Sequence, residues 1–171
     1  MDLGPLGDRY QVVRPIGRGT TTAVLEAWDG LGRRRVALKV PVEPFAGDGA
    51  FLDRLQREVG AVAGFAHPNV AAVHAIERAG QAAFVVVELV DGSSLRDMLG
   101  DRGPLPPAGA ARVAAGACAA VAAAHARGIA HGHLVPANVL LAIDGTPLAR
   151  TEDLTAALMS PSVTSCVSIG P

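Results

Sequence analysis

Apolar and polar positions alternate through much of the first 90 residues, and this alternation favours β-strands. Three segments, YQVVRPIGRG, TTTAVLEAWD and RRRVALKVPV, are also rich in β-branched residues. The turn-forming sequences DGLG (29–32) and EPFAGDG (43–49) separate them. Residues 67–90 contain two more strand-like runs with a turn at Ala79 and Gly80. The pattern therefore predicts five strands.

Helical periodicity appears between the third and fourth of these strands. Residues 50–65 place Phe51, Leu55, Val59 and Val62 at intervals of three or four positions. This spacing puts the four apolar side chains on one face of a helix. The expected order is three strands, one amphipathic helix and two strands.

Residues 108–126 form a second, different helical segment. Alanine dominates it and has the highest helix propensity. The segment is apolar nearly all round, so neighbours on several sides would be needed to bury it. Those neighbours are missing, and we expect part of its surface, such as the side of Ala110, Ala114, Cys118 and Ala122, to face water or a partner. The segment is long enough to cross a membrane, but it contains Arg112 and His125. The interpretation as a buried helix of a soluble domain is favoured, and no membrane span is expected within the chain.

Composition narrows the range of functions. The 171 residues have a formal net charge of −1, which argues against coating nucleic acid or binding a membrane through basic clusters. Cys118 and Cys166 have no metal-ligand spacing, and the N-terminus MDLGPLGDRY lacks the pattern of a secretory signal. We therefore expect a cytoplasmic protein.

A glycine-rich segment and a lysine are the first candidates for chemistry. GRGTTTAV follows an apolar strand, and its threonines favour another strand rather than the helix of a dinucleotide-binding fold. The result would be a hairpin whose backbone N–H groups can approach phosphates, although an ordinary turn explains the glycines as well. Lys39 lies within the apolar strand VALKV, and Glu58, on the predicted helix, could pair with it. A solvated lysine on an exposed face is the alternative.

These motifs, with REV, HPNV, VELVDGSSL and AAAHARGIAHGHLVPANVLL, occur in the order and at the spacings of one family. The chain resembles a bacterial eukaryotic-type Ser/Thr protein kinase from about Tyr10 to Asp153. The resemblance implies an α+β, protein-kinase-like fold: a five-stranded antiparallel N-lobe with one helix (10–89) and an incomplete, mainly helical C-lobe (90–158). An N-terminal tail (1–9) and a flexible C-terminal tail (159–171) would flank them.

The resemblance also implies an ATP site. Adenine would lie between four apolar side chains, Ile16, Val24, Ala37 and Leu140. The backbone of Glu88 and Val90 would read its edge, and Val87 would leave room behind it. The phosphates would lie under the hairpin residues Gly17, Arg18, Gly19 and Thr20 and bind Lys39, which Glu58 would hold. Asn138 and Asp153 would hold Mg²⁺, weakly.

The catalytic loop departs from the family pattern H-R-D-L-K-P-x-N. Here the loop is HGHLVPAN, so His133 replaces the aspartate that accepts the substrate proton. Gly132 replaces the arginine and Val135 the lysine. A neutral imidazole can accept a proton, but it brings no negative charge, and loss of a general base alone slows a reaction about 10²- to 10⁴-fold. We expect His133 to be inactive and the chain to be a pseudokinase.

Two further departures concern the third phosphate-loop glycine and the metal site. Thr22 stands at the glycine position. The D-F-G motif aligns either with residues 151–153 or with Asp153, Leu154 and Thr155, and the second alignment is preferred because it begins with a carboxylate. The chain also ends at Pro171 without an A-P-E motif, so we expect a truncated family member, a fragment, or a chain that needs a partner surface.

Three hypotheses for function follow. The first is an ATP-binding pseudokinase that signals by conformation or by recruiting an unknown protein partner. The second is a weak Ser/Thr kinase that transfers the γ-phosphate to protein hydroxyls, with His133 as base and Asp153 on magnesium. The third is a truncated remnant that binds no nucleotide.

Overall fold

The computed structural model describes residues 8–79, 82–143 and 163–167. The chain divides into two compact units, and each is described by itself. The first comprises residues up to 65 together with 72–89. The second comprises 66–71 and the residues from 90 onward that the structure describes.

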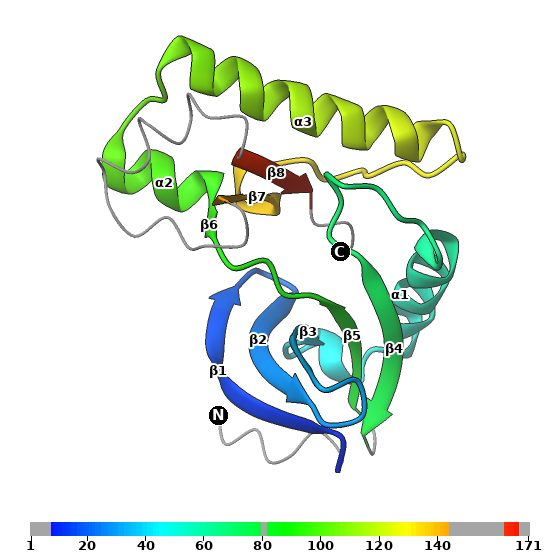
Figure 1. Cartoon of the computed structure of the whole chain (residues 1–171). Coiled ribbons are helices and arrows are strands. Elements are labelled where there is room, and N and C mark those ends of the chain that lie inside the picture. The colour runs from blue at the N-terminus through cyan, green and yellow to red at the C-terminus, as the bar shows by residue number, and fades with distance from the viewer. Residues whose placement is uncertain (1–7, 80–81, 144–162, 168–171) are drawn as a thin grey trace. The chain divides into compact units, whose positions relative to one another are not determined.

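The first unit is a five-stranded antiparallel sheet with one α-helix (Figure 1). The sheet has the order β1-β2-β3-β5-β4. Its elements along the chain are β1 (Tyr10–Arg18), β2 (Thr22–Asp29), β3 (Arg34–Pro41), the 3-10 turn η1 (Phe45–Gly47), α1 (Gly49–Val62), β4 (Val73–Ala79) and β5 (Ala82–Glu88). The predicted strands and helix are confirmed, as is the kinase-like N-lobe.

The two faces of this sheet bury different sets of side chains. One face packs apolar residues of all five strands together: Tyr10, Val12, Leu25, Ala27, Val36, Leu38, Val40, Ala75, Phe84 and Val86. The other face is covered by α1, whose Phe51, Leu55 and Val59 pack against Ala37 and Val85. The helix begins at its capping residue Asp48, whose carboxylate accepts hydrogen bonds from the N–H groups of Ala50 and Phe51. Lys39 alternates with Val36, Leu38 and Val40, so it lies on the face that α1 covers.

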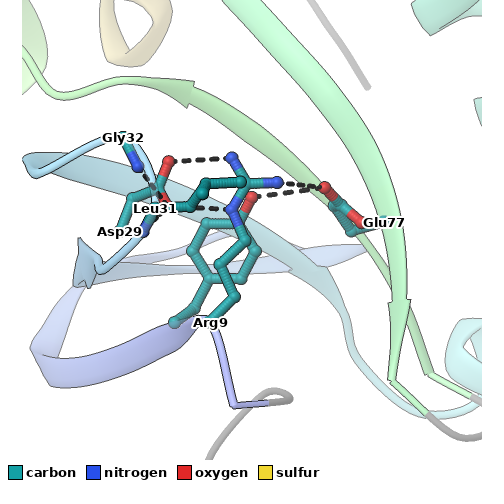
Figure 2. Close-up of polar contacts among 6 residues, drawn as sticks. Arg9, Asp29, Leu31, Gly32 and Glu77 are labelled. Carbon is teal, nitrogen blue, oxygen red and sulfur yellow. Dashed lines mark hydrogen bonds and ion pairs between the residues drawn. The ribbon is translucent and has the colours of Figure 1, made fainter.

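An ion-paired network joins the start of β1, the end of β2 and β4 (Figure 2). Asp29 is fully buried, and its two carboxylate oxygens accept hydrogen bonds from Arg9 at 2.8 and 2.9 Å. The N–H groups of Leu31 and Gly32 donate to Asp29 Oδ1, which shapes the turn after β2. Arg9 Nη1 also contacts Glu77 Oε1 at 2.9 Å. The Arg9 guanidinium holds the pKa of Asp29 well below its usual range, so the carboxylate stays ionised.

The second unit combines two α-helices with a small antiparallel sheet of order β6-β7-β8. Its elements are β6 (Ser93–Ser94), α2 (Leu95–Arg102), α3 (Pro107–His125), the 3-10 turn η2 (Pro136–Asn138), β7 (Val139–Ile143) and β8 (Val163–Val167). Met98, Val113, Val139 and Leu141 form its core. The five residues of β8 pair with β7 and so are not part of a flexible tail as we predicted. Their sequence, VTSCV, has β-branched residues that suit a strand.

Helix α3 is less buried than its composition suggested. It buries one side, through Gly109, Val113, Ala120 and Ala124. Ala110, Ala114, Cys118 and Ala122, on another side, are exposed. The exposure that we expected on this side of the helix is therefore confirmed for the described residues, because the packed neighbours cover the other side only. Among these residues α3 is one helix whose length and apolar composition would allow it to cross a membrane, but one such helix is weak evidence for a span.

Candidate functional site

The glycine-rich segment forms a tight hairpin between β1 and β2. The N–H of Gly19 donates to the carbonyl of Thr22 at 2.8 Å, and Gly17 pairs with Val24 in the ladder. Arg18 and Thr20 are exposed at its end. The strand that follows confirms the hairpin and excludes the dinucleotide-binding alternative. Gly17 and Gly19 have no side chain, so an anion could approach the hairpin backbone closely.

Two of the predicted adenine-lining side chains share a face of the first unit. Val24 lies opposite Lys39, and Ala37 lies two residues before Lys39 on β3, so their side chains point to the same side of the sheet. Ile16 is 38% exposed, at an interruption of the pairing between β1 and β2. Val87 is buried directly opposite Ala37. The sheet therefore brings these apolar residues near Lys39.

Lys39 is buried on this face, with 8% of its surface exposed. It makes no hydrogen bond or ion pair with any residue that the structure describes. Burial lowers the pKa of its ammonium group to about 8, because removal from water disfavours the charged form. The alternative of a solvated lysine on an exposed face is wrong. An unpaired buried cation is costly unless an anion binds it.

The structure does not bring Glu58 to Lys39. The carboxylate of Glu58 is 44% exposed and pairs with Arg54, one turn earlier on α1, at 3.2 Å. The predicted support of Lys39 by Glu58 is thus absent from this structure. The face of α1 that meets the sheet here is apolar, which leaves the ammonium group without a carboxylate.

The structure places Glu88, the last residue of β5, against the segment before β4. Its N–H donates to the carbonyl of Ala72 at 2.8 Å, and its Oε2 accepts from the N–H of Ala72 at 3.0 Å. Val90 belongs to the second unit and is half-buried. Reading of an adenine edge by these two residues stays a prediction.

In the second unit, the segment from His131 to Asn138 is a loop that ends in the turn η2. The side-chain amide of Asn138 donates to the carbonyl of His133 at 2.9 Å, and the N–H of His133 donates to His131 Nδ1 at 3.2 Å. Gly132, where the family has arginine, has a φ of 71°, a conformation that favours glycine. These contacts fix the backbone of His133 and leave its imidazole exposed. Leu140 follows on β7, half-buried.

One of the two predicted magnesium ligands, Asn138, belongs to the described residues. Asp153 lies outside the described residues. Asn138 can offer its amide oxygen, which accepts no hydrogen bond from the described part of the chain. Within that part, no three His, Cys, Asp or Glu side chains gather as metal ligands. Mg²⁺ is usually held through one or two carboxylates, so the described residues by themselves do not fit the ion.

One polar side chain on the Lys39 face was missed by the sequence analysis. Glu26 is buried on β2 between Leu25 and Ala27, and it pairs with Arg14 and Arg35. The sequence did contain a signal for it, because Glu26 is a carboxylate within an otherwise apolar strand segment and so could be expected to have a charged partner.

The hairpin, the buried lysine and the asparagine-anchored loop together are features of a protein kinase domain, and comparisons with known proteins give the same class. The sequence matches the protein kinase domain family over residues 10–160. The chain therefore belongs to the protein kinase family.

Individual relatives are bacterial Ser/Thr kinases. Over 160 residues the chain is 36% identical to the serine/threonine-protein kinase PknL of Mycobacterium tuberculosis. The aligned region covers 94% of this chain and 40% of PknL. The chain is 34% identical over 158 residues to a probable serine/threonine-protein kinase PknB of Lactococcus lactis, with 92% and 25% covered. The crystal structure of the M. tuberculosis PknI kinase domain aligns with a TM-score of 0.74 and 25% identity, covering 95% of this chain and 60% of that one. The chain thus spans less than half the length of these two curated relatives.

Proposed function

We propose that this protein kinase domain binds ATP but transfers its phosphate slowly or not at all, and that it acts by recruiting a protein partner. The observation that carries the nucleotide part is Lys39, a buried ammonium group without an anionic partner among the described residues. A nucleotide phosphate would supply the missing negative charge. The glycine-rich hairpin ends on β2, the strand that pairs with β3 and Lys39, and its backbone N–H groups would bind the same anion.

The residues would act on the nucleotide in three ways. Val24, Ala37, Ile16 and Leu140 would hold the adenine ring by apolar contact, with Glu88 and Val90 at its edge. Lys39 and the hairpin would orient the phosphates. Asn138 and Asp153 would hold a magnesium ion, which supplies charge neutralisation when it is bound. The described ligands for that ion are few, so we expect ATP binding to depend little on magnesium.

Weak transfer follows from the loop that contains His133. The position of the proton acceptor holds an exposed imidazole instead of a carboxylate, and Val135 provides no cation for the transferred group. Both changes remove electrostatic stabilisation that phosphoryl transfer requires. The fixed backbone of His133 then serves the shape of the loop rather than chemistry.

A thermal-shift measurement with ATP, with and without magnesium, tests nucleotide binding. ATP should raise the melting temperature of the parent in both conditions, because a ligand that binds only the folded state stabilises it. Lys39→Met should lose this rise, while Arg57→Met, which removes an exposed cation of α1, should keep it. No rise in the parent would instead support the remnant that binds no nucleotide.

A weak Ser/Thr kinase is the second candidate function. The observation in its favour is that the His133 imidazole is exposed and its ring nitrogens make no hydrogen bond within the described residues, so it can accept a hydroxyl proton. Transfer of radiolabelled phosphate from ATP to the chain itself or to a generic protein substrate decides between the two. We expect background incorporation in the parent. Robust incorporation that disappears in both Lys39→Met and His133→Ala would establish the kinase and its base.

A further inference from the structure

Three ion-paired side chains form a row across β1, β2 and β3 on the sheet face that carries Lys39. Glu26 on β2 lies directly opposite Ala37, two residues along from the pair that Lys39 forms with Val24. Its side chain is 6% exposed. From β3, Arg35 Nε donates to Glu26 Oε1 at 2.9 Å, and from β1, Arg14 Nη2 lies 2.8 Å from Glu26 Oε2. One buried carboxylate therefore ties β2 to both of its neighbours.

The two arginines belong to strands whose pairing with β2 differs in continuity. Arg35 belongs to the β2–β3 ladder, whose register is uninterrupted from Thr22 to Asp29. Arg14 belongs to a stretch of β1 between two register shifts, one after Val12 and one after Pro15. Register shifts interrupt the ladder and bend the strand. On β1 the Arg14–Glu26 contact therefore holds a segment whose backbone pairing is broken on both sides.

This bulged stretch leads directly into the glycine-rich hairpin. Pro15 lacks an N–H and cannot donate to the ladder, and the second register shift ends at Gly17, where the hairpin begins. Oε2 of Glu26 is buried and accepts no hydrogen bond from the described residues, so its contact with Arg14 is an ion pair. This ion pair, in which the Arg14 side chain is 63% exposed, is thus one side-chain contact that holds β1 to β2 at the base of the hairpin.

We propose that Glu26 is a positioning residue for the glycine-rich hairpin: through Arg14 it holds the bulged stretch of β1 against β2, so that the hairpin backbone meets the nucleotide phosphates in one orientation. This inference rests on the proposed function, because the hairpin is taken to cover those phosphates. Without the tie, the hairpin would have more conformations to lose on binding, and affinity would fall without any change in Lys39.

Arg14→Gln and Arg35→Gln form a matched pair for the test. Each removes one positive charge from the same carboxylate, but only Arg14 holds the bulged strand. Arg14→Gln should raise the Kd for ATP about two- to fivefold, the range for loss of an ion pair with an exposed arginine. Arg35→Gln should raise the Kd less, because its ladder has an uninterrupted register. Glu26→Gln, which keeps the side-chain shape, should match Arg14→Gln. Equal effects of the two arginine variants, or an unchanged Kd in Arg14→Gln, would overturn the proposal.

Hydrogen exchange of the nucleotide-free protein separates this inference from the proposed function. Peptides that cover residues 15–20 should exchange faster in Arg14→Gln than in the parent, and Arg35→Gln should resemble the parent. If the parent binds no ATP, the proposed function fails, and the exchange comparison still decides whether Glu26 orders the hairpin. Equal exchange in all three proteins would show that it does not.

Discussion

Lys39 is the only lysine in the chain, and all the other basic side chains are arginines. It lies buried on β3 without an anion among the described residues. Arginine stays charged in proteins, whereas a buried lysine shifts its pKa readily. Burial therefore lowers the pKa of the one lysine in the chain. A reagent that modifies amines can react with this side chain selectively.

We expect an amine-reactive acylating reagent to modify Lys39 with a rate that rises through about pH 8, the lowered pKa of its ammonium group. Only the neutral amine is nucleophilic, and an unperturbed lysine would reach half-maximal rate near pH 10.4. Peptide mass spectrometry distinguishes Lys39 from the N-terminal amine. ATP should protect Lys39 and not the N-terminus. A half-maximal rate above pH 10 would contradict the burial of this side chain.

Asp29 is the second residue whose ionisation the fold controls. Its pKa is held below the usual range by Arg9, so the folded state binds fewer protons than the unfolded state as the pH falls. Its contribution to stability is complete above the unfolded pKa of about 3.9 and is lost as the pH falls through the folded value.

Asp29→Asn should therefore lower the melting temperature at pH 7, by about 5 °C, since it weakens a charged hydrogen-bond network. The difference between parent and variant should narrow below about pH 4, where Asp29 of the unfolded parent begins to bind a proton and the stabilisation by its charge falls. Asp53→Asn, at an exposed position of α1, is the control and should change little. A difference independent of pH would mean that the Asp29 charge does not stabilise the fold.

At the scale of elements, Gly92 sets the approach of the chain to β7. A Cβ at this position would overlap the carbonyl oxygen of Leu141. Ser93 and Ser94, directly after it, pair with Leu141 and Leu140. Only glycine allows the backbone this close to the strand that follows the His133 loop.

Gly92→Ala should destabilise the second unit by about 2 kcal/mol or more, because backbone must move to admit the methyl group. Gly100→Ala is a matched control: it lies in α2, where a Cβ has open space, and should be neutral or stabilise by about 0.5–1 kcal/mol through helix propensity. Chemical denaturation measures both. Similar stability of the two variants would show that β6 tolerates a wider spacing from β7.

At the scale of the whole molecule, α3 presents an apolar face to solvent. Ala110, Ala114, Cys118 and Ala122 are exposed in a helix whose opposite side reaches the core through Val113. Continuous exposed apolar surface promotes association. The N-terminal sheet has no comparable helix face, since the apolar side of α1 is buried.

We therefore expect the isolated 171-residue chain to self-associate through α3 under reducing conditions, which exclude disulfides of Cys118. Light scattering should show particles larger than the 17.4 kDa monomer. The double variant Ala114→Glu, Ala122→Glu should be monomeric, because charged side chains oppose burial of this face. Limited proteolysis should cut near residues 101–107 before it cuts the strands of the first unit. A protease-resistant monomer would contradict the prediction.

Much of the fold could be predicted because its signals are local. The alternation of strands β1 to β5, the apolar stripe of α1 and the glycines of the hairpin depend on neighbouring residues, and the structure confirms each of them. The family motifs added the order of the elements and the departures at His133 and Val135. β8 was missed because its five residues follow a stretch without a periodic signal, and pairing with β7 supplies the hydrogen bonds that favour a strand.

Local pattern and motifs were enough to predict the kinase-like elements and the residue types at the site: Lys39 on a strand, an asparagine in the loop, and no aspartate at the base position. The pairing of charges could not be predicted in this way. Glu58 pairs with Arg54, Glu26 joins two arginines beside Lys39, and Asp29 is buried under Arg9. Such contacts depend on sheet register and helix orientation, which set the distance and the water around each charge and so its partner and its pKa.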